Sequence, residues 1–271
     1  MARQLYCRFF TAAMRMLVPG TRGLVPRKLN RAAGTEPTLH VAAPGASVTR
    51  SNLAPASIEG DVLGVNYFVL CRDSALWPRA KMFVIEPHRT YRDYTKALAS
   101  VAEANGPIDV IVKGALSPSK LASASRLVRA AARVDGVSVK LAADMYLSDF
   151  PHASFAKAIA EHPQRTFCGS KSLLWTISFG VAAGYRRIVL HGFDFSKDYA
   201  YTASPPGVSR PRPNTWVTDD DTTQYVLDQV AELSTYLESR GVRLLQHDCD
   251  GPLSTMLPAY APTDLRRENP A

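Results

Sequence analysis

Short apolar runs alternate along the chain with longer stretches in which apolar residues recur every three or four positions. Runs of the first kind predict buried β-strands, and stretches of the second kind predict amphipathic helices. We expect strands near residues 39–43, 62–66, 82–86, 110–113, 137–141, 187–191 and 242–246. We expect helices over residues 91–104, 119–134, 152–161, 172–183 and 222–240. Because such alternation is typical of a parallel sheet with crossover helices, the predicted fold class is α/β, Rossmann-like, with a mostly parallel sheet flanked by helices.

The length and composition of the chain fit a single domain. The chain has 271 residues, of which 46% are hydrophobic, and this is enough to bury one sizeable core. We assign residues 37–265 to one α/β domain and residues 1–36 to a basic N-terminal arm. No stretch approaches the roughly 20 consecutive apolar residues that a membrane-spanning helix needs. The four cysteines are scattered, without the close pairs of zinc or redox sites, so we expect free thiols in a reducing cytoplasm.

The basic arm changes the picture of where the protein resides. Seven basic residues precede the first acidic residue, Glu36, in a chain whose formal net charge is +8. Apolar side chains are interleaved with the basic ones between residues 3 and 17, so this segment can form a basic helix that lies on an anionic membrane surface. A disordered arm and a helix packed on the domain are the alternatives. We expect a cytoplasmic protein, with peripheral contact to the inner face of the membrane as one arrangement of the arm. No recognised nucleic-acid-binding motif accompanies the charge, so nucleic acid is not an expected partner.

The segment 198–217 differs from the rest of the predicted domain. Four prolines and one glycine within it forbid regular secondary structure across its length. It is therefore predicted to be a long loop that follows the edge of the sheet. Loops of this length in compact domains are usually lids over a ligand or disordered segments, and both interpretations are open here.

Small and polar residues follow three of the predicted strands, at the edge where open α/β sheets bind ligands. The turn at residues 43–47 consists of small residues, so its backbone can approach a phosphate closely, although an ordinary tight turn is the alternative. It lacks the GxGxxG and GxxxxGK[ST] patterns, which disfavours a dinucleotide site and a Walker-type ATPase site. Asn66 can both donate and accept hydrogen bonds. Asp194 places a carboxylate just beyond a strand, where capping of a turn is the alternative role.

Together these segments resemble the bacterial family-42 sialyltransferases over about residues 38–260. The run APGAS at 43–47 is similar to the family's GNGPS turn, and GVNYF at 64–68 is similar to its RCNQF strand. The run GYRRIVLHGFDF at 184–195 looks closely like the family's GYKEIYLSGIDF.

Two further residues extend the resemblance. Ser172 falls on the serine that begins the preceding helix of the family, and Tyr199 resembles a tyrosine that holds the donor phosphate. The resemblance implies a nucleotide-sugar-binding domain that transfers a sugar, with inversion, from a CMP-activated donor to a glycan or lipid-linked acceptor of the kind found in bacterial surface polysaccharides. It implies no metal and no other cofactor. The donor-binding residues implied by it are Gly45, Ser47, Asn66, Ser172, Asp194 and Tyr199.

The general base is not given by the resemblance. The family's histidine precedes the C-terminal helix, and the matching residues 214–224 contain no histidine. Asp219 and Asp220, in a run of three aspartates, lie nearest to that position. His191 is a further candidate, for which a packed strand residue is the alternative role. For the aspartates the alternative role is helix capping, with a favourable interaction between their charge and the helix dipole.

Two other functions are compatible with the same residues. The glycine–aspartate strand is shared with a related group that includes hydroxymethylpterin diphosphokinases. A magnesium-dependent pyrophosphokinase would use Asp194 and one aspartate of the 219–221 run to hold a metal bridging ATP phosphates. A nucleotide-binding relative that has lost its base is the third interpretation.

Overall fold

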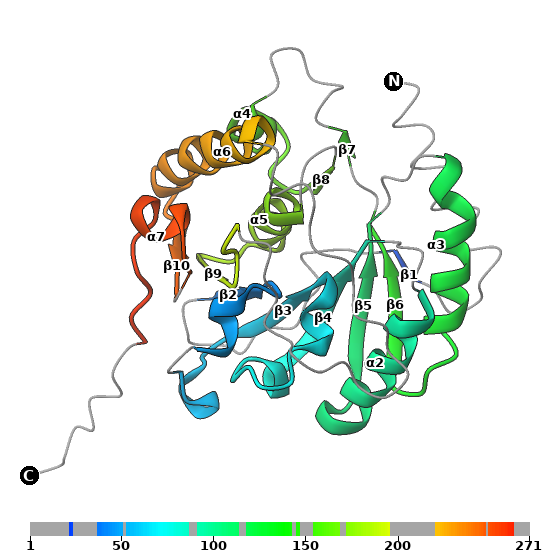
Figure 1. Cartoon of the computed structure of the whole chain (residues 1–271). Coiled ribbons are helices and arrows are strands. Elements are labelled where there is room, and N and C mark those ends of the chain that lie inside the picture. The colour runs from blue at the N-terminus through cyan, green and yellow to red at the C-terminus, as the bar shows by residue number, and fades with distance from the viewer. Residues whose placement is uncertain are drawn as a thin grey trace, which may run out of the picture.

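A sheet of eight parallel strands forms the centre of the computed structural model, in the order β1-β6-β5-β4-β3-β2-β9-β10 (Figure 1). The structure describes residues 22–23, 37–50, 53–86, 91–113, 118–142, 145–146, 154–168, 172–195, 220–247 and 249–262. The strands of the sheet are β1 (Arg22–Gly23), β2 (Thr38–Ala42), β3 (Asp61–Val65), β4 (Ala80–Ile85), β5 (Ile108–Val112), β6 (Val137–Leu141), β9 (Arg187–His191) and β10 (Arg243–Gln246). A separate parallel pair is formed by β7 (Met145–Tyr146) and β8 (Phe167–Cys168).

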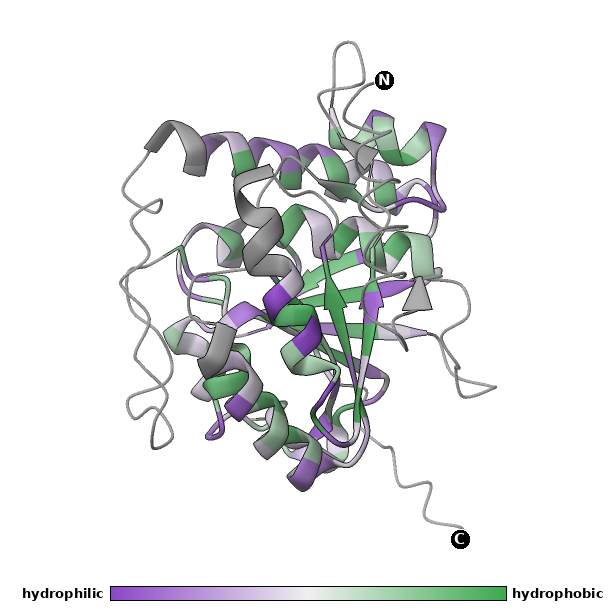
Figure 2. Cartoon of the chain, turned by 90° about the vertical axis from the view of Figure 1, so that its right-hand side faces the viewer, coloured by the Kyte–Doolittle hydropathy of each residue, from purple (hydrophilic) through white to green (hydrophobic). Residues whose placement is uncertain are grey.

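The helices lie on both faces of the sheet. They are α2 (Tyr91–Asn105), α3 (Pro118–Ala131), α4 (Phe155–Glu161), α5 (Ser172–Ala183), α6 (Asp220–Glu238) and the short α7 (Pro252–Met256). The α2 and α3 helices pack with one buried cluster of apolar residues, and α4, α5 and α6 pack with a second cluster on the other face. Figure 2 shows apolar strands between these layers, with the hydrophilic residues of the helices turned outward. The predicted α/β class with a parallel sheet flanked by helices is confirmed.

The direction in which strands are added reverses once, next to β2. From β2 the chain adds β3, β4, β5 and β6 on one side, and it then returns to place β9 and β10 on the other side. The β2–β9 pair is therefore the topological switch point, the place on the carboxyl edge where open α/β sheets bind ligands. The fold thus indicates a ligand site beyond Ala42 and His191.

The α5 helix is apolar around its whole circumference because it is enclosed by the sheet and by α4 and α6. Ten of its twelve residues are buried, including Trp175 and Phe179, whose rings stack with centroids 5.4 Å apart. Its two buried hydroxyls, on Thr176 and Ser178, donate to carbonyls three residues earlier. The helix is thereby fixed in the core, and its first residue, Ser172, is held at a defined place on the sheet edge.

Candidate functional site

The exits of β2 and β9 are joined by main-chain hydrogen bonds. The Ala43 amide donates to the carbonyl of His191 at 2.8 Å, and the Gly45 amide donates to the carbonyl of Gly192 at 2.9 Å. These bonds carry the pairing of the two strands beyond their ends. The turn at residues 43–47, which is predicted to approach a phosphate, is therefore hydrogen-bonded to the end of β9 and the glycine that follows it.

Asp194 connects three loops at this switch point. Its Oδ2 accepts from the backbone amide of Ser47 at 2.8 Å, and its Oδ1 accepts from the Ser47 hydroxyl and from the backbone amide of Asp250 at 3.2 Å. The structure thus brings together Gly45, Ser47 and Asp194, as the sequence predicts. Asp194 is only 7% exposed and accepts three bonds from the protein, so the geometry supports a positioning role for its carboxylate. Direct contact between Asp194 and a donor stays a prediction.

Gly45 lies where the two exits approach each other most closely. A Cβ atom on this residue would lie 2.2 Å from the Gly192 carbonyl oxygen and 2.6 Å from Oδ2 of Asp194. Because the first of these atoms is backbone, Gly45→Ala is expected to force the turn away from β9 and to lower the free energy of unfolding by roughly 2–3 kcal/mol. Urea denaturation measures the change.

Gly241→Ala is the matched control for this substitution. Gly241 has a φ of +69°, but the nearest atom to an added Cβ lies 3.8 Å away, on Arg186. Gly241→Ala should therefore lower the free energy of unfolding by roughly 1 kcal/mol, because of its backbone conformation and without a steric clash. Equal losses in the two variants would contradict the close approach at Gly45.

A second polar group follows the neighbouring strands β3, β4 and β5. Asn66 donates from Nδ2 to the Ser172 hydroxyl at 3.2 Å, and its Oδ1 accepts from the Glu86 amide at 2.9 Å. The Ser172 hydroxyl in turn donates to Oε1 of Glu86 at 2.7 Å, which closes a ring of three residues. Lys113 adds an ion pair to the same Oε1 at 2.6 Å. We call Asn66, Glu86, Lys113 and Ser172 the polar network.

The polar network fixes what its members can offer to a ligand. The Glu86 amide can only donate, so it holds the Oδ1 atom of Asn66 and leaves the Nδ2 group as the donor of that side chain. Asn66 also has a φ of +49°, in the left-handed region that asparagine tolerates better than most residues. Such a backbone at the exit of a buried strand is typical of functional sites. Asn66 donates one of its two Nδ2 hydrogens to Ser172, and the other can be offered to a ligand next to the carboxylate of Glu86.

The prediction from sequence found two members of this network and missed two. It placed Asn66 and Ser172 in the donor site, and the structure brings them together. It did not single out Glu86 and Lys113, although each ends or directly follows a predicted buried strand. A charged residue at the exit of an apolar strand is the signal that would have found them.

Of the three predicted base candidates, one has a described side chain. His191 is 1% exposed, and its Nε2 lies 3.0 Å from Nδ1 of His40. Burial lowers the pKa of His191 well below its ordinary value, and nearby His40 and His247 lower it further. A base must reach the acceptor, so this placement does not support His191 in that role. Asp220 begins α6 with its side chain outside the described residues, and Asp219, Tyr199 and the loop 198–217 also lie outside them.

His191 belongs to a buried group of rings beneath the switch point. The centroid of its ring lies 5.2 Å from that of His40 and 5.5 Å from that of His247, and Tyr260 packs edge-on against His40 at 5.3 Å. We call these four residues the histidine cluster. Burial lowers the pKa of His40 to about 4, although a hydrogen bond to the Glu59 carbonyl acts in the opposite direction. His40 and His191 are therefore neutral rings at neutral pH.

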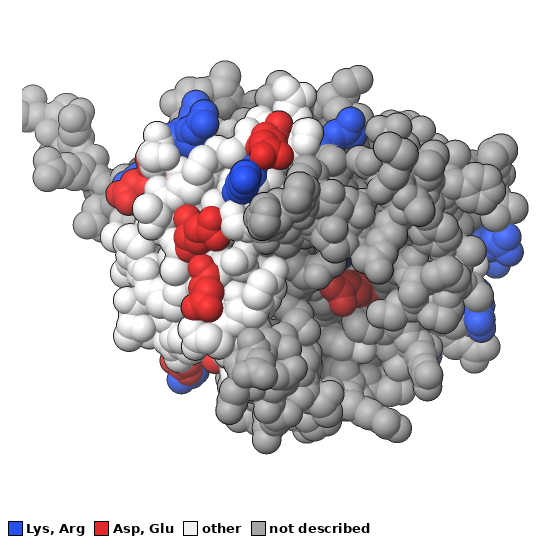
Figure 3. All heavy atoms as spheres, turned by 90° about the horizontal axis from the view of Figure 1, so that it is seen from above, with Lys and Arg blue, Asp and Glu red and all other residues white. Residues whose placement is uncertain are grey.

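The described part of the chain shows neither a metal centre nor a reactive thiol. No group of three histidine, cysteine, aspartate or glutamate side chains there is arranged to hold a metal ion. Burial raises the pKa of the Cys249 thiol to about 12, which leaves it unreactive at neutral pH. None of the described helices is long and apolar enough to cross a membrane. Acidic and basic side chains of the described residues are interspersed when the molecule is seen from above (Figure 3).

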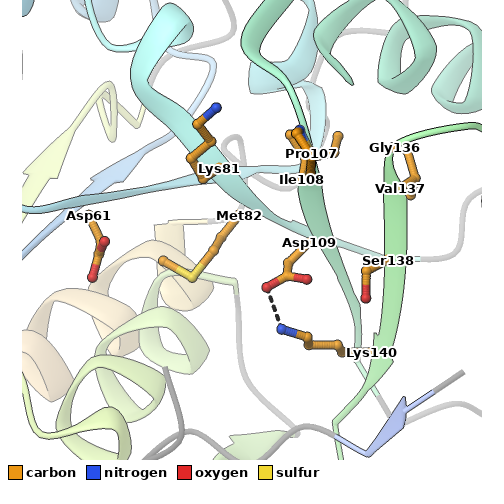
Figure 4. A pocket seen from close by; sticks show the side chains of 10 residues that line it. All are labelled: Asp61, Lys81, Met82, Pro107, Ile108, Asp109, Gly136, Val137, Ser138 and Lys140. Carbon is orange, nitrogen blue, oxygen red and sulfur yellow. Dashed lines mark hydrogen bonds and ion pairs between the residues drawn. The ribbon is translucent and has the colours of Figure 1, made fainter. Parts of the chain in front are cut away.

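A cavity of about 590 Å³ opens at the opposite edge of the sheet, where β3 to β6 begin (Figure 4). Lys140 pairs there with Asp109, and Asp61 accepts from the hydroxyl of Tyr185 at 2.5 Å. Lys81, also in its lining, donates to a backbone carbonyl. Each of these charged side chains is bonded to another group of the protein, so the lining does not favour binding of an anion or of a cation. Because α/β sheets bind ligands at the carboxyl ends of their strands, the cavity is separate from the candidate site.

The comparison with solved structures decides what fold surrounds this site. One neighbour is the sialyltransferase CstII from Campylobacter jejuni in complex with a substrate analogue, CMP-3FNeuAc, with a TM-score of 0.54, 13% sequence identity, and 83% of this chain and 87% of that chain covered. Another is the monofunctional α-2,3-sialyltransferase Cst-I from the same organism, with a TM-score of 0.54, 16% identity, and 86% of this chain and 83% of that chain covered. The chain shares the fold of these sialyltransferases. No protein-family model matches the sequence, and no curated protein matches it closely.

Proposed function

We propose that the protein is a glycosyltransferase that binds a CMP-activated sugar at the carboxyl edge of its sheet and transfers the sugar, with inversion, to a glycan or lipid-linked acceptor. The observation that carries this proposal is the joining of the predicted donor residues into two groups on one edge, Gly45, Ser47 and Asp194 at the switch point and Asn66 with Ser172 beside it. The shared fold supports it, since a CstII structure contains a CMP-sugar analogue.

The described residues suit such a reaction without a metal. Within residues 43–46, the Ala43 and Gly45 amides bond to β9 and Pro44 has no N–H, so the Ala46 amide is the donor that this turn can offer to the phosphate, and Asn66 offers a side-chain N–H. Tyr199, as a residue implied to hold the donor phosphate, would complete this half of the site. The protein would act in the cytoplasm, with the basic arm 1–36 bringing it to the inner face of the membrane and so to a lipid-linked acceptor.

Thermal denaturation with CMP, CDP, CMP-sialic acid and ATP with Mg²⁺ tests the proposal. A ligand that binds the folded state at 100 times its Kd stabilises it by about 2.7 kcal/mol, which raises the melting temperature of a chain this size by about 5–10 °C. We expect this shift with CMP and CMP-sialic acid. Asn66→Ala should reduce it, whereas Asp109→Asn, at the opposite edge, should not.

Each other outcome points elsewhere. A shift with ATP and Mg²⁺ but not with CMP would favour the pyrophosphokinase. Binding of CMP without turnover of any CMP-sugar would favour a relative that has lost its base. No shift with any of these nucleotides would contradict the proposed function.

A further inference from the structure

Three described carboxylates follow strands at the carboxyl edge of the sheet, and their surroundings differ. Asp194 is 7% exposed and accepts three hydrogen bonds from the protein. Asp250 lies on the surface, paired with Arg50, with 59% of each side chain exposed. Glu86 is intermediate, because 35% of its side chain is exposed while Oε1 is held by two partners. Glu86 alone of the three is both fixed by its neighbours and only partly buried.

The partners of Glu86 suit a group that must stay ionised and in place. The Lys113 ammonium, on a side chain only 7% exposed, lies 2.6 Å from Oε1, and a charge-assisted bond of this kind stabilises the carboxylate form. The Ser172 hydroxyl donates to the same oxygen at 2.7 Å, from the first residue of the rigid α5 helix. Lys113 and Ser172 come from different elements, so together they fix the rotamer of Glu86. A carboxylate held in this way is ionised and keeps one orientation before a substrate binds.

We infer that Glu86 is the general base of the transfer reaction, an assignment that rests on the proposed function. The acceptor hydroxyl gives its proton to the Glu86 carboxylate while its oxygen bonds to the anomeric carbon of the donor sugar. The bond from that carbon to the phosphate oxygen breaks, and its electron pair leaves with CMP. Glu86 then releases the proton to water. Its backbone amide binds Asn66, so the base lies beside the residues predicted to hold the donor.

Glu86 differs from the base candidates predicted from the sequence, Asp219 and Asp220, which nothing in the described residues tests. The prediction of these aspartates rests on their nearness to the position of the missing histidine. Glu86 is instead selected by its contacts with Asn66 and Ser172. The two assignments make different predictions for single variants, so one set of measurements separates them.

The test measures CMP release from CMP-sialic acid with a galactose-terminated oligosaccharide as acceptor. We expect Glu86→Gln to lower kcat by about 10²–10⁴-fold, to remove the fall in rate at low pH, and to change CMP affinity by less than about threefold. Asp109→Asn is the matched control, because Asp109 also pairs with a lysine, Lys140, but at the opposite edge. It should retain the wild-type rate.

Glu86→Gln leaves the buried Lys113 ammonium without its partner carboxylate, so this variant could lose activity because it is less stable. A second variant separates that effect from loss of the base. The double variant Glu86→Gln with Lys113→Met removes both charges and should show the same loss of kcat. A rate within threefold of wild type in either variant overturns the assignment, as does a loss of rate matched by an equal loss of CMP affinity. Loss of activity in Asp219→Asn or Asp220→Asn with Glu86→Gln unaffected would move the base to the start of α6. A wild-type protein that neither binds CMP nor releases it from a CMP-sugar overturns the proposed function and this assignment together.

Discussion

Replacing Asp194 with alanine is expected to lower the free energy of unfolding by roughly 3 kcal/mol or more and to abolish nucleotide binding. Three donors lose their acceptor in this variant, namely the amide and hydroxyl of Ser47 and the amide of Asp250. Ser47 is 1% exposed, so water cannot readily replace the carboxylate. Each buried donor left without a partner costs roughly 1–3 kcal/mol. Urea denaturation and a CMP titration measure the two effects.

Two further variants separate the carboxylate from its surroundings. Asp194→Asn keeps the shape but replaces one acceptor oxygen by a donor, so we expect an intermediate loss of stability. Asp250→Ala removes only an exposed ion pair with Arg50 and keeps the Asp250 amide, so its effect should be below about 1 kcal/mol. If Asp194→Ala were no less stable than Asp250→Ala, the three-loop junction would not hold the site together.

The second large effect is a loss of stability in mild acid. In the unfolded chain, histidines take up a proton as the pH falls through 6.5, whereas burial lowers the pKa of His40 to about 4 and that of His191 well below its ordinary value. The folded state therefore binds fewer protons than the unfolded state between these values. Stability is complete above pH 6.5 and is lost as the pH falls toward 4. Two such histidines make the free energy of unfolding fall by about 2–3 kcal/mol per pH unit near pH 5.

The charges facing the cluster act in the same direction as burial. Arg187, on β9, and Arg79, near the start of β4, disfavour a positive charge on His40, and His247 does so from the end of β10. Urea denaturation at several pH values gives the slope directly. His191→Gln should lower this slope by the contribution of about one proton, that is by about half. Glutamine keeps a polar contact with His40 but does not titrate near pH 5. An unchanged slope in this variant would show that other groups cause the acid sensitivity.

Acid should weaken nucleotide binding over the same range. His191 provides the carbonyl that binds the Ala43 amide, and Gly192 provides the one that binds Gly45. Movement of the histidine cluster therefore displaces both loops of the switch point. The pH at which CMP affinity falls should accordingly follow the pH at which stability falls.

Much of the fold could be predicted because its elements have strong periodicity or clear ends. The strands at Val137–Leu141 and Arg187–His191 and the helix at Ser172–Ala183 are predicted with the bounds observed, and the other long elements differ by a few residues. The two-residue strands β1, β7 and β8 were missed, since two residues carry no pattern. Their formation depends on neighbours that only the folded chain provides.

The site was predictable only in part, for a physical reason that its residues make clear. Gly45 and Asn66 can be named from their places at strand ends, and resemblance to motifs adds Ser172; contact of these residues with a donor stays a prediction. The histidine cluster was missed because His40 and His191 are separated by 151 positions, and no local pattern records their contact. Glu86 could not be selected from the sequence, because its contacts with Lys113 and Ser172 join elements that are distant along the chain.

The distance along the chain between the two strands of the switch point also bears on when the site forms during folding. In the β2–β9 pair, Thr38 faces Arg187, so nearly 150 residues must be enclosed before these strands meet. Closing so long a loop is entropically costly, and pairings of this kind tend to form after local ones such as β3 with β4. The three-loop junction further requires Asp250, beyond the last strand. A chain emerging from the ribosome can therefore complete this junction only after Asp250 has left the ribosome, and a ligand bound there would favour this late step of folding.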